Sequence, residues 1–176
     1  MSADPQVTAP EGGVDLRAAT TADVPAAAHV WRDAWLDGHV GRVPDELLPA
    51  RGPDYFREKL GALVASTVLV VDDVDGRILG LVVVAGDELF QLAVDRRASG
   101  RGVGSALLAA AEARIGAGHA QAWLAVVPDN TRARALYERR GWRDAGPFTY
   151  AAPAEGEAIP VPVLRYVKDL APLPSS

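Results

Sequence analysis

The sequence predicts an α+β domain in three layers: a mixed, mostly antiparallel sheet of about seven strands with helices on both faces. Two observations support this prediction. Three apolar runs rich in β-branched residues, at 67–72, 78–85 and 88–94, are separated only by short turns, so neighbouring runs should pair antiparallel. The third run leads through a glycine-rich turn and a helix to a strand at 121–127, and such a crossover makes those two strands parallel. The sheet should therefore contain a central parallel β-α-β unit.

The other elements follow from hydrophobic periodicity and capping residues. Thr20, with Asp23 three residues later, resembles a capping box and starts a first helix that ends near Asp37-Gly38. Gly141 ends a later helix that begins at Asn130. The remaining predicted elements are a strand at 14–17, a helix at 54–63, and two C-terminal strands at 142–150 and 163–170. We expect a disordered leader at 1–13, one domain at 14–170 and a tail at 171–176.

The composition restricts the chemistry. The 176 residues include no cysteine, which excludes disulfides, a thiolate zinc site and transfer through an acyl-cysteine. His29, His39 and His119 are scattered without metal-ligand spacing, so we expect no metal. A net charge of −5 argues against nucleic-acid binding. The sequence has neither a signal-peptide pattern nor an apolar run approaching about 18 residues, so we expect a cytoplasmic protein with no membrane partner.

A glycine cluster at 99–105, Ser-Gly-Arg-Gly-Val-Gly-Ser, lies between the third strand and its helix. The first N–H groups of a helix lack intrahelical partners, and the helix dipole adds partial positive charge. Glycines let a diphosphate approach this backbone, and Arg96, Arg97 and Arg101 would add cations. A nucleoside-triphosphate loop would need a lysine here, and a dinucleotide-binding loop a different glycine spacing and an acidic residue about 20 residues later. A coenzyme A pyrophosphate site and a tight turn without a ligand remain as alternatives.

Two motifs around this cluster resemble the GNAT superfamily of acetyl-CoA-dependent N-acetyltransferases. The segment 92–108 is similar to the family's Gln/Arg-x-x-Gly-x-Gly/Ala motif, with Gly102 and Gly104 at its glycine positions and Ser99 in place of Gln or Arg. The segment 130–142 is similar to the family's Asn-x-x-Ala-x-x-Leu-Tyr-x-x-x-Gly-Phe, with Trp142 at the aromatic position. The resemblance covers roughly residues 14 to 170.

The resemblance implies that acetyl-CoA is the co-substrate and that the two parallel strands are splayed to seat it. The main chain of Leu92, Ala93 and Val94 would pair with the pantetheine arm. The pyrophosphate would be held by Ser99, Gly100, Arg101, Gly102, Val103, Gly104 and Ser105. The Asn130 amide would bond the pantetheine or the adenine side, although Asn130 is equally suited to cap a helix.

The resemblance also suggests catalytic residues. Tyr137 would be the general acid for the leaving thiolate, unless it only packs on the core, and Glu88 would be the general base, unless it is a solvated acid at a hairpin. Trp31 and Trp35 share a helix face and would line the acceptor site near His39 and Tyr55, or simply pack in the core. Arg132 and Arg134 would reach the coenzyme's 3′-phosphate or form a solvated helix face.

The function these features favour is N-acetyltransfer, in which acetyl moves directly from acetyl-CoA to a primary amine on an unidentified small-molecule or peptide acceptor. The alternatives are a catalytically silent acyl-CoA-binding sensor or subunit, and a nucleotide-binding protein that uses the glycine loop. The sequence leaves the oligomeric state open, and a homodimer formed through the C-terminal strands is the option it allows.

Overall fold

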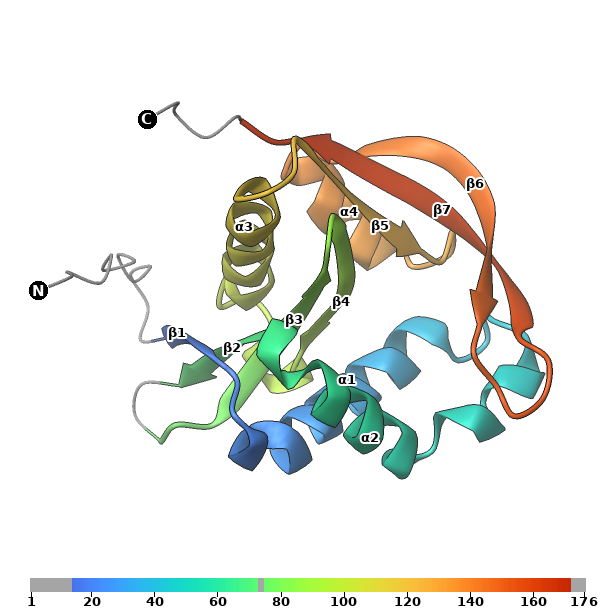
Figure 1. Cartoon of the computed structure of the whole chain (residues 1–176), viewed down its shortest axis with the longest axis horizontal. Helices are drawn as coiled ribbons and strands as arrows, with labels where there is room; N and C mark the ends of the chain where they lie inside the picture. Colours follow the sequence, from blue (N-terminus) through green and yellow to red (C-terminus); the bar gives the residue numbers. More distant parts are fainter. Residues whose placement is uncertain (1–13, 73–74, 172–176) are drawn as a thin grey trace, which may run out of the picture.

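One mixed sheet organises the chain. The computed structural model describes residues 14–72 and 75–171; the predicted leader and residues 172–176 of the predicted tail lie outside this range. The strands are β1 (Val14–Ala18), β2 (Thr67–Asp72), β3 (Ile78–Ala85), β4 (Glu88–Val94), β5 (Gln121–Val126), β6 (Arg143–Ala152) and β7 (Ile159–Asp169). They lie side by side in the order β1-β2-β3-β4-β5-β7-β6, and only β4 and β5 are parallel neighbours (Figure 1). The predicted fold class is confirmed.

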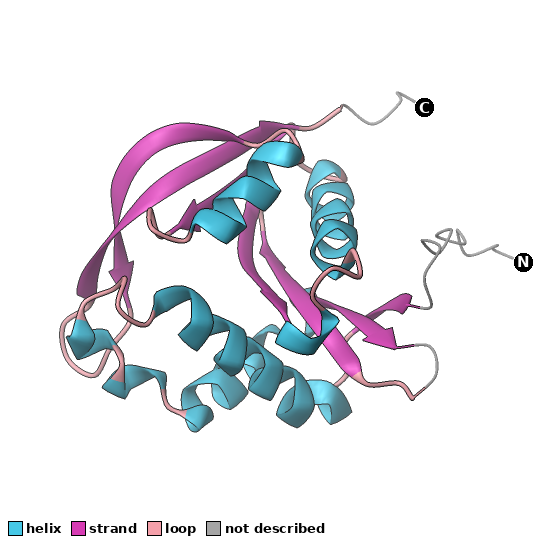
Figure 2. Cartoon of the chain, turned by 180° about the vertical axis from the view of Figure 1, so that it is seen from behind, coloured by secondary structure: helices cyan, strands magenta, loops and turns pink. Residues whose placement is uncertain are grey.

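Helices cover both faces of the sheet and divide the core in two. The helices are α1 (Val24–His39), α2 (Pro53–Leu63), α3 (Val103–Gly116) and α4 (Thr131–Arg139). Trp31 and Phe56, from α1 and α2, pack with Leu81 of β3, whereas Leu107 of α3 packs in a second cluster with Val82, the next residue of β3. Successive strand residues point to opposite faces, so one strand supplies both clusters. Figures 1 and 2 show α1 and α2 together on one side of the sheet and α3 and α4 on the other.

The two C-terminal strands are longer than the sequence predicts, because prolines that look like loop residues lie inside β7. Pro160 pairs in register with Ala151 and Pro162 with Thr149. The pairing of β7 with β5 begins only at Leu164, so at both prolines β7 has a strand neighbour on one flank alone. A missing N–H is tolerated on an unpaired flank. The expected strand at 163–170 is therefore corrected to Ile159–Asp169, and that at 142–150 to Arg143–Ala152.

The β4–β5 pair is parallel only where the two strands begin. One bridge, Glu88 to Trp123, joins them, supported by a hydrogen bond of 3.0 Å from the Trp123 N–H to the Asp87 carbonyl. Beyond this point β4 continues to pair with β3, and β5 pairs with β7 over all six of its residues. The sheet is therefore split between β4 and β5, with the closed end at Glu88.

The entry into α1 is fixed by Asp23. This residue ends a short 3₁₀ helix (Thr21–Asp23), and its carboxylate accepts hydrogen bonds of 2.8 Å from the Thr20 backbone N–H and from both terminal nitrogens of Arg17 on β1. The predicted capping box is present. These contacts hold the pKa of the Asp23 carboxyl well below its usual range, chiefly through the Arg17 hydrogen bonds. They tie the first strand to the helix that walls the cavity described below.

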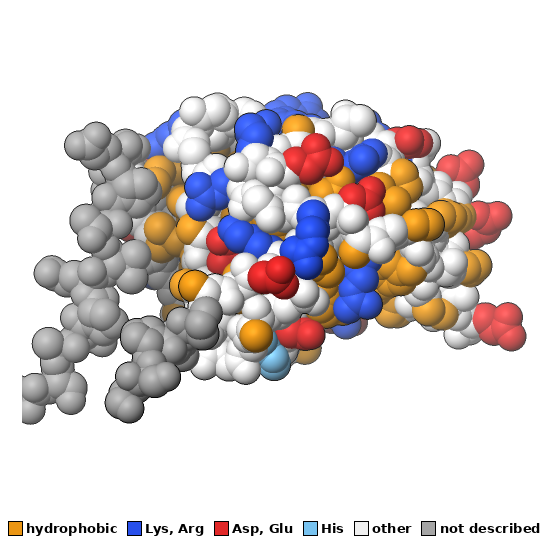
Figure 3. All heavy atoms as spheres, turned by 90° about the horizontal axis from the view of Figure 1, so that it is seen from above, with side chains coloured by type: hydrophobic (Ala, Val, Ile, Leu, Met, Phe, Trp, Pro, Cys, Tyr) orange, Lys and Arg blue, Asp and Glu red, His pale blue; other side chains and the backbone are white. Residues whose placement is uncertain are grey.

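The surface of the described residues carries charged and apolar side chains side by side (Figure 3). Seen from above, Lys and Arg side chains lie close to Asp and Glu side chains, with apolar side chains between them (Figure 3). None of the helices in the described ranges has the length and apolar character to cross a membrane. Within the same ranges, no group of three or more His, Cys, Asp or Glu side chains is arranged to hold a metal ion.

We predict that Asp23→Asn lowers the free energy of unfolding at pH 7 by about 1 kcal/mol, the usual size of a lost cap. The native pKa is depressed, so the carboxylate contributes its full stability above the unfolded pKa of about 3.9 and loses it as the pH falls toward the native value. Urea unfolding of both proteins from pH 7 to pH 2 should therefore show a difference that shrinks below about pH 4.

The exposed Glu58, on α2, offers a control of the same chemical type. Glu58→Gln should leave the free energy of unfolding within about 0.5 kcal/mol of the wild-type value. Equal stability of Asp23→Asn and the wild type at pH 7 would contradict the structural role given to Asp23.

Candidate active site

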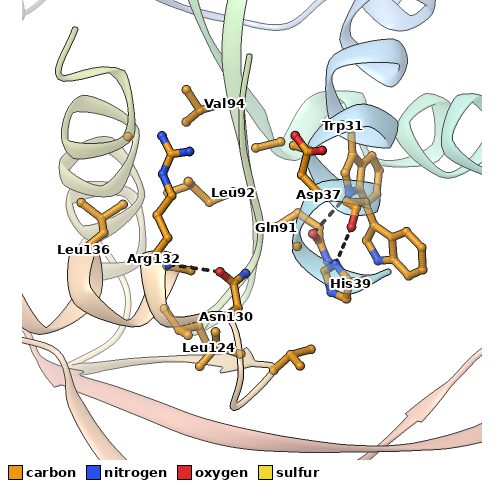
Figure 4. A pocket seen from close by; sticks show the side chains of 18 of the residues that line it. Trp31, Asp37, His39, Gln91, Leu92, Val94, Leu124, Asn130, Arg132 and Leu136 are labelled. Carbon is orange, nitrogen blue, oxygen red and sulfur yellow. Dashed lines mark hydrogen bonds between the residues drawn. The ribbon is translucent and has the colours of Figure 1, made fainter. Parts of the chain in front are cut away.

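A cavity of about 550 Å³ occupies the split between β4 and β5 and continues to the face of α1. The main chain of β4, the glycine loop and the first turn of α4 line one part, and α1, the α1–α2 connection and the ends of β6 and β7 line the other. Figure 4 shows Arg132 and Leu136 on one side of the pocket and Trp31, Asp37 and His39 on the other, with Asn130 and Leu124 at its base. Residues from distant parts of the chain therefore meet around one hollow.

The glycine loop turns its backbone toward this cavity. Gly100 and Gly102 have φ angles of +80° and +75°, and a Cβ on either would meet nothing within 4 Å, so the space over the loop is open. The first backbone bond of α3 runs from the Ala106 N–H to the Gly102 carbonyl at 3.0 Å. In residues 14–72 and 75–171, no backbone carbonyl accepts from the N–H groups of Gly100, Gly102, Val103, Gly104 or Ser105. These donors line the cavity and suit a diphosphate.

Arg101 is held by two partners within the protein. Its N–H donates to the Ala98 carbonyl at 3.3 Å, and its side chain forms an ion pair with Asp72 at 3.0 Å. Arg101 is absent from the residues that line the cavity. The Arg101 backbone thus closes the turn of the loop, and its side chain fastens the loop to β2.

The other predicted cations of the loop are also neutralised by carboxylates. Arg96 pairs with Asp37 of α1, and Arg97 pairs with Asp95 at 2.8 Å. A different arginine reaches the loop: Arg132, from the first turn of α4, donates to the Ser99 hydroxyl. No ion pair of Arg132 with a carboxylate occurs in the described chain. Ser99, in the position where the motif carries Gln or Arg, thus holds an arginine supplied by another helix.

Arg134 lies outside the cavity. Its Nε donates to the Tyr166 hydroxyl and its Nη1 to the Pro128 carbonyl, both at 3.0 Å, and Tyr166 in turn donates to Glu138 at 2.7 Å. This network fixes α4 to β7. A role for Arg134 at the coenzyme's 3′-phosphate has no support from its position, whereas Arg132 lines the cavity.

The strand edge at Leu92, Ala93 and Val94 is open toward β5. These residues pair with Val82, Leu81 and Gly80 of β3, and their side toward β5 has no strand partner within the described residues. A register shift between Val83 and Val84 leaves Phe90 as an extra residue of β4. Such a bulge turns the local strand and re-aims its backbone groups. The sequence carried no signal for this bulge.

Tyr137 is buried beside the cavity. It is 7% exposed, and its ring lies 6.2 Å from that of Trp142 and 6.1 Å from that of Tyr166. Burial raises the pKa of the Tyr137 phenol to about 12. At that pKa the phenol keeps its proton at neutral pH, and a protonated hydroxyl can donate it.

Asn130 caps α4. Its side-chain oxygen accepts from the Ala133 N–H at 3.2 Å, as a helix N-cap does. Its Nδ2 faces α1, where a Cβ at Gly38 would approach it to 3.1 Å. The capping alternative is therefore confirmed, while Asn130 also lines the cavity with its amide nitrogen beside Gly38.

Glu88 lies at the closed end of the split. Its side chain is half-buried and lines the cavity. Burial raises the pKa of the Glu88 carboxyl, the neighbouring Asp87 raises it further, and Arg165 opposes both. A carboxylate whose pKa is raised is a better proton acceptor than an ordinary surface acid.

The α1 side chains both pack and line the cavity. Trp31 and Trp35 are buried; Trp31 donates to Gln91 of β4 at 3.2 Å, and Trp35 stacks on His39 with ring centroids 4.5 Å apart. His39 Nδ1 lies 2.8 Å from the Trp35 carbonyl, and since a carbonyl only accepts, Nδ1 carries the hydrogen. Burial lowers the pKa of His39 to about 4, so the ring is neutral at pH 7. Trp31 and Trp35 therefore both pack in the core and line the cavity.

Arg51, Gln91 and Tyr150 are among the cavity residues that the sequence analysis did not identify. Arg51 comes from a proline-bounded connection without periodicity, and Gln91 and Tyr150 occupy ordinary strand positions. Their type and spacing match no motif. Only the folded sheet brings them to the hollow beside Glu88 and Trp35.

The sequence of this chain is similar to known acetyltransferases. Residues 26–142 match the acetyltransferase (GNAT) family. Over 85 residues the chain is 44% identical to the mycothiol acetyltransferase of Clavibacter sepedonicus, a stretch that is 46% of this chain but only 28% of that relative. The chain thus spans well under two thirds of that relative.

Three solved structures of similar fold share between 17% and 21% of their sequence with this chain. A GCN5-related N-acetyltransferase from Rhodopseudomonas palustris has a TM-score of 0.70 at 21% identity, covering 89% of this chain and 95% of that one. The PaiA N-acetyltransferase of Thermoplasma acidophilum, in complex with coenzyme A, has a TM-score of 0.65 at 17% identity, covering 89% and 98%. A phosphinothricin acetyltransferase from Sinorhizobium meliloti, in complex with AcCoA, has a TM-score of 0.68 at 18% identity, covering 90% and 89%. Family match and fold agree, and the chain belongs to the acetyltransferase (GNAT) family.

Proposed function

We propose that the chain is an N-acetyltransferase that transfers acetyl directly from acetyl-CoA to a primary amine. One observation carries the proposal. A loop of backbone N–H groups without backbone acceptors, an unpaired strand edge, a buried phenol and a half-buried carboxylate all line one cavity. Diphosphate binding, seating of an amide-bearing arm, and proton transfer each need one of these parts.

Acetyl-CoA fits the open features of this cavity. Its pyrophosphate would accept from the N–H groups of Gly100 and 102–105, with the Arg132 guanidinium beside the loop at Ser99. Its pantetheine arm carries amides, and these would bond the main chain of 92–94 along the edge that β5 leaves open. Two fold neighbours, from Thermoplasma acidophilum and Sinorhizobium meliloti, were solved with coenzyme A and AcCoA, and they support this cofactor.

The reaction requires two proton transfers: the attacking amine loses a proton, and the leaving sulfur gains one. The amine nitrogen attacks the thioester carbonyl carbon, the C–S bond breaks, and the sulfur leaves as a thiolate. Tyr137 would give that sulfur a proton. Burial raises the pKa of the phenol, but the same apolar surroundings disfavour a buried thiolate as well, so the proton transfer is better matched than the phenol's pKa alone suggests.

Glu88 would accept the proton of the attacking amine, directly or through water. An alkylammonium has a pKa of about 10.4, so at neutral pH it must lose a proton before it can attack. The raised pKa of Glu88 brings the carboxyl closer to the working pH and makes its carboxylate a stronger base. The acid and the base would then act from different walls of the cavity, one from α4 and one from the start of β4.

The direct test is release of free thiol from acetyl-CoA with a panel of primary amines. Thiol release that depends on the amine, together with a product heavier by one acetyl group, is the expected result. Tight coenzyme A binding with no release for any amine would instead favour the silent acyl-CoA-binding module.

We predict that Gly102→Glu abolishes coenzyme A binding measured by calorimetry. The side chain would enter the open space over the loop, add negative charge where the diphosphate binds, and strain a backbone at φ +75°. Gly156→Glu is the matched control, because Gly156 also has a positive φ (+91°) with nothing within 4 Å, but it lies outside the cavity lining. Unchanged affinity in Gly102→Glu would exclude the loop as the binding site.

We predict that Tyr137→Phe lowers kcat by about 10²-fold while the Kd for coenzyme A stays within a few-fold, the scale of lost general-acid catalysis. Tyr166→Phe is the control: its ring lies 6.1 Å from that of Tyr137, but its hydroxyl is bonded to Arg134 and Glu138. Tyr166→Phe should cost stability and leave kcat nearly unchanged. A Tyr137→Phe enzyme with full turnover would show that the thiolate is protonated by another group.

We predict that kcat/KM falls on the acid side with a midpoint above 4.5, because Glu88 must be ionised to accept a proton and its pKa is raised above that value. Glu88→Gln should lower kcat/KM by about 10²-fold at pH 7 and remove this limb of the pH profile. Asp87→Asn, which takes away a charge that raises the Glu88 pKa, should move the limb to lower pH. A wild-type profile without an acid limb would rule out Glu88 as the base.

A further inference from the structure

Arg51 is a buried cation in the part of the cavity walled by α2 and β6. It belongs to a short 3₁₀ helix (Pro49–Arg51) between α1 and α2 and is only 6% exposed. It lines the cavity together with Tyr55, Tyr150 and Pro153. In the described chain it forms no ion pair with a carboxylate. A buried charge without a counter-charge is costly, and such groups are usually paired.

Protein groups satisfy only part of this guanidinium. Nη1 donates to the Pro153 carbonyl at 2.8 Å and to the Ala50 carbonyl at 3.2 Å, and the guanidinium carbon lies 4.2 Å from the centre of the Tyr55 ring. A guanidinium has five N–H donors. Among the described residues, Nε and Nη2 have no hydrogen-bond acceptor. These two nitrogens form one edge of the planar group, which is the edge that binds a carboxylate through two parallel hydrogen bonds.

Arg51 and the proposed base, Glu88, line the same cavity. Tyr150 lines the cavity, and its pKa responds to the charges of both Glu88 and Arg51 while burial is the main cause of its rise. Tyr150 therefore lies within electrostatic range of both groups. His39 is also near Arg51 but is neutral at pH 7, since burial lowers its pKa to about 4.

Apolar side chains line the same cavity as these polar groups. They include Trp35 and Val161, which belong to the buried core cluster, and Tyr55 and Phe90, which pack against it. An acceptor that reaches from Arg51 to Glu88 would thus place an apolar segment between two polar ends. The structure offers one buried cation for one end and one carboxylate for the other.

We propose that the acceptor is an amino carboxylate, whose carboxylate binds Nε and Nη2 of Arg51 while its amine lies at Glu88. This inference rests on the proposed acetyl transfer and adds the class of acceptor. A carboxylate is favoured over a phosphate because one buried guanidinium matches a single negative charge, and the exposed Arg42 already donates to the Asp37 carbonyl. A polyamine would place a second cation against Arg51 and is disfavoured.

The experiment compares primary amines in matched pairs, each a carboxylate and its carboxamide, such as phenylalanine with phenylalaninamide and 4-aminobutyrate with 4-aminobutyramide. Thiol release from acetyl-CoA gives kcat/KM for each. We expect the carboxylate of at least one pair to be preferred by at least about tenfold, the scale of a charge-assisted hydrogen bond. Equal or better use of the carboxamide in every pair, or a preference for 2-aminoethyl phosphate over all carboxylates, overturns the proposal.

Arg51 variants test whether Arg51 is the group that distinguishes the carboxylate from the carboxamide. In Arg51→Met and Arg51→Lys the ratio of kcat/KM for the carboxylate to that for the carboxamide should fall toward one, because KM for the carboxylate rises. The loss should be larger in Arg51→Met, since Arg51→Lys keeps the charge but not the two-nitrogen edge. Arg57→Gln is the matched control, because Arg57 is an exposed arginine of α2 outside the cavity lining, and it should keep the wild-type preference. Thermal unfolding and coenzyme A affinity show whether each variant is folded. A preference that survives in a folded Arg51→Met protein overturns the assignment.

Acetyl transfer and recognition of a carboxylate by Arg51 can be tested separately. If no amine releases thiol, acetyl transfer is refuted, and calorimetry of the same pairs with the coenzyme A-loaded protein then decides the inference. Tighter binding of the carboxylate that is lost in Arg51→Lys supports it, and equal binding of both members overturns it.

Discussion

The parting of β4 from β5 is the constraint on which the site depends. β5 is fully paired to β7 on its other side and β4 to β3, so each strand follows its own ladder beyond the point where the two meet. The single bridge at Glu88 and Trp123 sets where the gap begins. Backbone groups along an open strand edge seek partners, and unmade hydrogen bonds in a poorly solvated space cost about 1–3 kcal/mol each. A ligand with amides along its length would relieve this cost, which is why the proposed pantetheine arm suits the edge.

Charge is distributed unevenly around this gap. At the loop, Arg96, Arg97 and Arg101 are each held by a carboxylate, and this pairing fixes the loop to α1 and β2. The attraction for an anion then rests on backbone N–H groups, the start of α3 and Arg132. Fixed dipoles of this kind need no rearrangement when the ligand arrives. Inside the cavity the same burial keeps the Tyr137 phenol protonated and the His39 ring neutral, so the charges of the lining come from its carboxylates and arginines, among them Glu88 and Arg51.

The sequence predicts most of the fold because local signals and tertiary structure agree. The boundaries of β2, β3 and β4 match the predicted runs, since turn residues separate the runs and β2 and β3 are largely buried. The prediction fails at β7, where Pro160 and Pro162 indicate a loop by local rules. Their tolerance depends on where β5 stops pairing with β7, which is a property of the assembled sheet. The bulge at Phe90 depends on partner register in the same way and leaves no trace in composition.

The candidate site divides along the same line. The half proposed to bind coenzyme A is built from two contiguous segments, the glycine loop and the start of α4, so spacing alone identifies it; only the partner of each arginine needs the fold. The half proposed to bind the acceptor is assembled from α1, the α1–α2 connection, the start of β4 and the ends of β6 and β7. Arg51 illustrates the difference, because its burial depends on the Pro153 carbonyl, 102 positions away in the chain. A short motif is therefore enough to preserve the half proposed to bind coenzyme A, whereas substitutions at distant positions can change the half proposed to bind the acceptor. The acceptor has to be inferred from the folded cavity for this reason.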